Sequence, residues 1–89
     1  MQEHQIVAKR LSDSNGGLEH ITHVKYDNAV HTRGEVIRAI SARTDAFFVR
    51  GGGAITWVEV VHPGYPRDPY IRTRPDWTGK DNLLSLPDC

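Results

Sequence analysis

The chain has 89 residues, of which 38% are hydrophobic and 25% charged, and its eleven Lys and Arg balance eleven Asp and Glu. This length fits one small domain with one core, and the composition is that of a folded protein rather than a disordered one. A net charge of zero argues against long-range attraction to nucleic acid or an anionic membrane as its mode of recognition.

Two strands are predicted in the first third of the chain. The run from His4 to Leu11 reads as one short strand, and residues 12–17 have almost pure turn composition. A second run, from Ile21 to Tyr26, should pair with the first in antiparallel fashion. Ile21 and Val24 are three residues apart, so a bulge near Thr22 and His23 is needed to bring both side chains to one face.

One helix is predicted from about Arg33 to Ala42. Thr32 and Glu35 have the spacing of a capping box, and Val36, Ile37 and Ile40 follow at helical intervals. A helix of about three turns is unstable alone, so its apolar stripe should pack on a sheet.

Three further strands are predicted in the second half, at Ala46–Val49, Ala54–His62 and Tyr70–Arg74. The first two flank the glycines at 51–53 and should pair as a hairpin. Residues 63–69 contain three prolines and should be irregular. The apolar tail, residues 83–89, should pack on the sheet and shield an edge strand.

This order of elements predicts an α+β fold in a single domain spanning residues 1–89. We expect a bent antiparallel sheet of about five strands, in the order β-β-α-β-β-β, with one helix packed on it; a small β-barrel with one helix is the alternative. Most of the core should come from Val36, Ile37, Ile40, Phe47, Val49, Ile55, Trp57, Val58, Val60 and Ile71.

The C-terminal region carries a recognisable pattern: Tyr70-Ile71-Arg72-Thr73, then Asp76, Thr78, Lys80-Asp81-Asn82-Leu83 and Leu86-Pro87. Agreeing features upstream are the Ile21-to-Val24 strand, Glu35-Val36-Ile37, Phe47-Phe48-Val49 and Val58-Glu59-Val60-Val61. Over nearly its whole length the chain resembles the bacterial family called domain of unknown function 3892. The resemblance implies no activity, because that family has no assigned catalytic or binding residues. The glycines at 51–53 and the loop at 63–69 look like local variations on its pattern.

The main candidate site is a group of aromatic and basic residues in the last third of the chain. It comprises Tyr65, Arg67, Tyr70, Arg72, Arg74, Trp77 and Lys80. Alternation places Tyr70, Arg72 and Arg74 on one strand face, and an aromatic ring flanked by arginines on a sheet is how single-stranded nucleic acid is bound. The alternative is an ordinary polar strand face, with Trp77 in the core and the two arginines paired with Glu59, Asp76 or Asp81.

Metal binding and catalysis are not predicted. His20 and His23 are the only closely spaced ligand pair, whereas zinc needs about four converging ligands. The glycines at 51–53 are followed by a strand, not by the helix that a phosphate loop requires. Glu59 with His62, or Asp81 with His23, could form an acid–base pair, but so small a domain rarely builds a substrate pocket. We therefore expect no metal, no cofactor and no enzymatic activity.

The sequence favours a non-enzymatic module that binds another protein through its sheet edge, its proline-rich loop or the aromatic residues Tyr65, Tyr70 and Trp77. The alternative is a nucleic-acid-binding domain that uses Arg72, Arg74, Lys80 and Trp77. The chain should be a monomer or a weak dimer and should not bind membranes. Its one cysteine, Cys89, is typical of a reducing compartment, so we expect a cytoplasmic protein.

Overall fold

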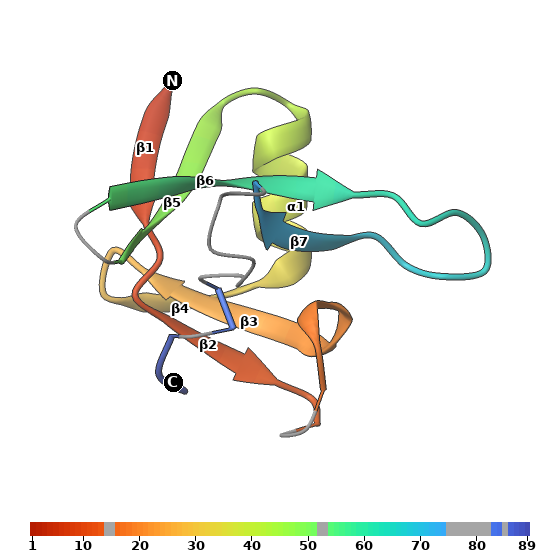
Figure 1. Ribbon diagram of the computed structural model, residues 1–89. Coiled ribbons are helices and arrows are strands. Elements are labelled where there is room, and N and C mark those ends of the chain that lie inside the picture. Colours follow the sequence, from red (N-terminus) through yellow and green to blue (C-terminus); the bar gives the residue numbers. More distant parts are fainter. Residues whose placement is uncertain (14–15, 52–53, 75–82, 85) are drawn as a thin grey trace.

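In the computed structural model, the described residues form two β-sheets and one α-helix (Figure 1). The structure describes residues 1–13, 16–51, 54–74, 83–84 and 86–89. In chain order the elements are β1 (Gln2–Gln5), β2 (Ala8–Leu11), the 3-10 helix η1 (Leu18–His20), β3 (Ile21–Tyr26), β4 (Ala29–Thr32), α1 (Arg33–Ser41), β5 (Asp45–Gly51), β6 (Ala54–Val61) and β7 (Tyr70–Thr73). One sheet has the order β1-β5-β6-β7 and the other β2-β3-β4. The α+β class is confirmed, whereas the barrel alternative is wrong because the described strands do not close.

The prediction of one bent sheet is also wrong, because the first predicted strand is two strands in different sheets. The chain changes sheets between Ile6 and Val7. The Ile6 amide donates to the Phe48 carbonyl oxygen at 2.9 Å and continues the β1–β5 ladder, whereas the Val7 amide donates to the Lys25 carbonyl oxygen at 2.9 Å and begins the β2–β3 ladder. β1 runs parallel to β5, a pairing that local sequence signals do not reveal.

The predicted antiparallel pairs are present. β2 pairs with β3, and β5 pairs with β6. Arg10 lies opposite His23 and Leu11 opposite Ile21, so Thr22 is the extra residue of the predicted bulge, and Ile21 and Val24 are both fully buried. β4 was not predicted; its four residues pair with β3 after a tight turn in which Asp27 and Asn28 have positive φ angles.

The helix forms where its cap predicts. The Glu35 amide donates to the Thr32 hydroxyl oxygen at 3.2 Å, which satisfies one of the free amides at the helix start. α1 contacts β3 and β4 of one sheet and β5, β6 and β7 of the other. Val36 is fully buried at this junction, while Ile37 and Ile40 are half-buried beside it. The helix therefore covers the opening between the two sheets.

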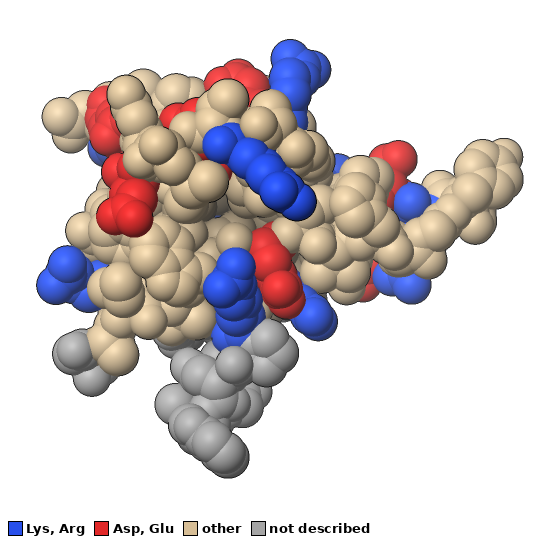
Figure 2. Space-filling model, turned by 90° about the horizontal axis from the view of Figure 1, so that it is seen from above, with Lys and Arg blue, Asp and Glu red and all other residues tan. Residues whose placement is uncertain are grey.

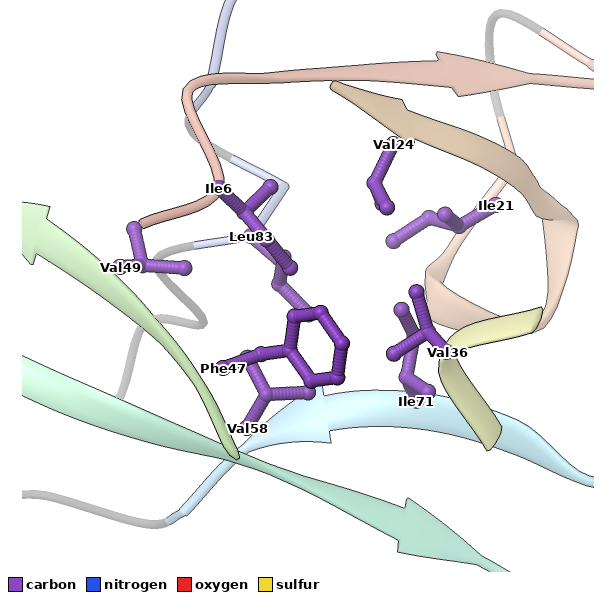
Figure 3. Packing of buried hydrophobic residues seen from close by; sticks show 9 residues of the cluster. All are labelled: Ile6, Ile21, Val24, Val36, Phe47, Val49, Val58, Ile71 and Leu83. Atoms are coloured by element: carbon purple, nitrogen blue, oxygen red, sulfur yellow. The ribbon is translucent and has the colours of Figure 1, made fainter. Parts of the chain in front are cut away.

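The core lies between the sheets and α1, with Phe47 at its centre (Figure 3). Its buried members are Ile6, Ile21, Val24, Val36, Phe47, Val49, Val58, Ile71 and Leu83. Ile55 was predicted to be in the core but is 45% exposed, because it lies on the outer face of β6. Trp57 and Val60 are only half-buried. Conversely, Ile6 is fully buried because the chain turns inward where it changes sheets.

Candidate interaction surfaces

The loop between β6 and β7, residues 62–69, projects away from the body of the molecule (Figure 1). Tyr65 near its tip is fully exposed. The Arg67 amide donates to the Gly64 carbonyl oxygen at 2.9 Å, which closes a turn, and Gly64 has a φ of 94°, a backbone conformation that favours glycine. The loop thus presents an aromatic side chain to solvent on a turn of defined shape.

The turn that carries Tyr65 is attached to η1 through Arg67. The Arg67 guanidinium forms a hydrogen-bonded ion pair with the Glu19 carboxylate, which raises the pKa of Arg67 further through the hydrogen bond and the charge. Arg33 Nη1 donates to the Glu19 carbonyl oxygen at 2.9 Å. A polar hollow of about 290 Å³ lies here, lined by Glu19, His20, Arg33, Pro66, Arg67 and Asp68. Arg67, predicted as a binding residue, is therefore already engaged within the chain.

Strand β7 alternates as predicted. Ile71 and Thr73 are buried, whereas Tyr70 and Arg72 are half-buried on the outer face of the sheet. Arg72 lies directly opposite Glu59 on β6, and its Nε donates to Glu59 Oε1 at 2.8 Å. This is one of the pairings that the sequence left open. Arg72 is thus partly neutralised, which weakens its case as a phosphate ligand.

Sequence reasoning missed an aromatic pair on the same outer face. Phe48 of β5 lies opposite Trp57 of β6, with ring centroids 5.6 Å apart in an edge-to-face arrangement. Arg50 lies on the same side of β5 as Phe48, and the Arg74 amide donates to the Trp57 carbonyl oxygen at 2.8 Å. Phe48 could have been found by alternation, because Phe47 and Val49 occupy the buried side of the strand.

Two predicted site residues, Trp77 and Lys80, lie outside the described residues. The structure therefore brings together Tyr70, Arg72 and the exposed Arg74 on the outer face of one sheet, and it places Tyr65 and Arg67 on the adjoining loop. Positive and negative side chains are interspersed over the face shown in Figure 2. This distribution agrees with the overall charge balance.

Comparison with protein families connects this architecture to a known group. A family model described as protein of unknown function (DUF3892) matches residues 5–87. The chain belongs to this family. Comparisons with curated proteins and with solved structures found no match. Membership confirms the resemblance seen in the sequence, and it assigns no role to any residue.

A polar cluster surrounds the buried His4, which was not predicted as a site. His4 is 9% exposed, and its Nδ1 lies 2.8 Å from Asp27 Oδ2 while its Nε2 lies 2.6 Å from Asp45 Oδ2. Ionised carboxylates only accept hydrogen bonds, so both contacts are satisfied together when each ring nitrogen carries a proton. His4 thus links β1, the β3–β4 turn and β5.

Tyr26, His31 and Glu35 extend this cluster towards α1. Tyr26 packs against His4, and it stacks on His31 with centroids 3.9 Å apart. Burial, followed by the charges of Glu35, Asp45 and Asp27, raises the pKa of Tyr26. The pKa of Glu35 is lowered, chiefly by its hydrogen bond with His31, and that of Asp45 is lowered by hydrogen bonds from Thr44 and then His4. These contacts join elements to one another.

The described residues include His, Cys, Asp and Glu side chains, which are the usual metal ligands in proteins. In that part of the chain no group of three or more His, Cys, Asp and Glu side chains is placed to hold a metal ion. The one α-helix described is too short to cross a bilayer.

Proposed function

We propose that this chain is a non-enzymatic module that binds another protein through the loop at residues 62–69 and the adjoining outer face of β5, β6 and β7. The observation that carries the proposal is the fully exposed Tyr65 on a projecting loop that Arg67 attaches to η1. Tyrosine is enriched among residues that dominate binding energy, because it buries a large area at a low entropic cost. A loop that is attached to the rest of the fold also loses less conformational freedom when a partner binds.

The outer sheet face extends this surface. Phe48, Trp57 and Ile55 supply apolar area, and Tyr70 continues it towards the loop. The Arg72–Glu59 ion pair lies between Trp57 and Tyr70 on this face, so the proposed interface combines apolar and charged groups, as protein interfaces commonly do. Binding rather than catalysis is also supported by His4, because both of its ring nitrogens already face carboxylates from other elements.

The proposal is tested by capture of partners from native cell extract, with proteins identified by mass spectrometry. Wild type should retain a partner after nuclease treatment, and the double substitution Tyr65→Ala with Arg67→Ala should lose it while the circular dichroism spectrum stays unchanged. Val30→Ala is the matched control, because Val30 is an exposed apolar residue on β4, outside the proposed surface. Equal capture by wild type and the double variant would contradict the role of the loop.

A second candidate function is binding of single-stranded nucleic acid on the same sheet face. The observation that favours it is the Phe48–Trp57 pair, with Arg50 on the same side and Arg74 adjoining. The Arg72–Glu59 pair and the zero net charge weigh against it. Titration with a labelled oligonucleotide at increasing salt decides between the two functions. Affinity that falls steeply with salt and drops in Arg74→Ala would support this candidate, and a flat response would eliminate it.

A further inference from the structure

The outer edge of β2 is occupied by the end of the chain. One side of β2 pairs with β3, while residues 86–89 lie along the other side. The Lys9 amide donates to the Pro87 carbonyl oxygen at 2.9 Å, and the Cys89 amide donates to the Lys9 carbonyl oxygen at 2.8 Å. Lys9 and Asp88 form a parallel bridge. The segment 86–89 is therefore held as a short added strand.

The side chain of Lys9 also binds residues 86–89 and holds them against β2. Lys9 is only 6% exposed, which is rare for lysine. Its Nζ donates to the Leu86 carbonyl oxygen at 2.7 Å and to Asp88 Oδ1 at 3.1 Å. Arg10 Nε donates to the Cys89 carbonyl oxygen at 3.3 Å. Two basic side chains thus bind two backbone carbonyls and one carboxylate of the same four residues.

The two sides of this contact are unequal. Lys9 is buried, but the Asp88 side chain is 80% exposed, so the segment 86–89 lies on the surface above an ammonium group that depends on it. If the segment leaves, Lys9 loses both oxygen partners that the segment supplies, and its backbone N–H and C=O become an unpaired strand edge, which readily pairs with another chain. The edge of β2 therefore favours reoccupation by a segment with the same carbonyl and carboxylate pattern.

We propose that this edge also accepts the segment 86–89 of a second copy of this chain, so that two molecules associate by exchanging their terminal segments. The second copy is the occupant because it carries the pattern that the edge of β2 binds in this structure. A hollow of about 460 Å³, lined by Lys9, Arg10, Leu11, Gly16, Leu84 and Asp88, adjoins the segment. The exchange re-forms the contacts of the monomer and needs no new surface chemistry.

The monomer is favoured at low concentration, because a segment on the same chain acts at an effective concentration of about millimolar. Exchange should therefore dominate only at high protein concentration, or when the chain's own segment fits poorly. This dependence allows the proposal to be tested with paired variants of the full chain.

The test mixes two variants with complementary defects and measures association by analytical ultracentrifugation. Lys9→Met damages the edge but keeps the segment, and methionine fills a similar volume without a buried charge. Asp88→Lys keeps the edge but places a cation against Lys9. In the mixture, the intact edge of the Asp88→Lys chain can bind the intact segment of the Lys9→Met chain. We expect the mixture to associate at least about fivefold more tightly than either variant alone, because like charges oppose the segment of the Asp88→Lys chain itself.

The control mixture replaces Asp88→Lys with Asp68→Lys, which makes the same charge change at an exposed acid in the β6–β7 loop. Association of the test mixture that is no tighter than that of this control would overturn the proposal. If Lys9→Met does not fold, a fluorescein-labelled peptide of residues 83–89, with Ser in place of Cys89, replaces it. That peptide should bind the full Asp88→Lys chain several-fold more tightly than a peptide carrying Lys at position 88; equal binding would overturn the exchange.

Discussion

Leu83 offers the sharpest test of how the end of the chain contributes to stability. It is fully buried in the same cluster as Ile6 and Phe47 (Figure 3), whereas the adjacent Leu84 is 36% exposed. Replacing Leu83 with alanine removes buried apolar area and leaves a cavity. Because Leu84 is the same residue type one position along the chain, Leu84→Ala is a matched control.

The magnitude follows from burial. Replacement of a fully buried leucine by alanine costs about 2 to 5 kcal/mol. At about 0.05 to 0.15 kcal/mol per residue, a chain of 89 residues has a free energy of unfolding of about 4 to 13 kcal/mol. Leu83→Ala should therefore remove a large fraction of the total, and it should lower Tm by about 4 to 8 °C for each kcal/mol lost.

Urea denaturation followed by tryptophan fluorescence measures both variants. Leu83→Ala should lower the free energy of unfolding by about 3 kcal/mol, and Leu84→Ala should change it by less than about 1 kcal/mol. Similar losses in the two variants would refute the reasoning, because the fold would then not depend on which leucine is buried. A loss below about 1 kcal/mol for Leu83→Ala would refute it too, since so small a cost is typical of a side chain outside the core.

Two further predictions concern local contacts. Thr32→Ala should lower the free energy of unfolding by about 1 kcal/mol, because it removes the hydroxyl oxygen that accepts from the Glu35 amide. Thr32→Ser keeps a hydroxyl and should retain most of that stability. Equal losses for the two variants in urea denaturation would contradict the role of Thr32 as helix cap. The pKa values of Glu35 and Asp45 are lower in the folded protein than in the unfolded protein, where they are about 4. The two carboxylates therefore stabilise the folded protein at pH values above about 4, and this stabilisation should be lost as the pH falls through their pKa values in the folded protein. Asp45→Asn should therefore be less stable than wild type at pH 7 and approach it near pH 2, and a difference that does not change with pH would contradict this assignment.

Elements with strong signals between near neighbours were predictable. The α-helix begins at its predicted cap because Thr32 and Glu35 are three residues apart and act within one turn. The bulge at Thr22 follows from the spacing of two apolar residues on one strand. Likewise, the outer position of Tyr70 and Arg72 follows from alternation along β7.

The candidate surface was predictable only in part. Tyr65 stands out because a proline-rich loop cannot join a sheet and leaves its side chains exposed. The Arg67–Glu19 and Arg72–Glu59 pairs depend on which elements become neighbours, so only the second was among the expected alternatives. Phe48 was assigned to a predicted strand and Trp57 to the core. Their contact on the outer face depends on the register of the β5–β6 hairpin, which places them opposite each other.

By itself, the sequence determined the fold class, the helix and its cap, the β5–β6 hairpin and the family, because these depend on residues close together in the chain or on a pattern along it. Only the tertiary structure decided that the chain changes sheets between Ile6 and Val7 and that β1 runs parallel to β5. It also decided that Lys9 is buried beneath residues 86–89. The physical reason is that these features join segments about 20 to 80 residues apart, whose meeting depends on the packing of the whole core rather than on local preference.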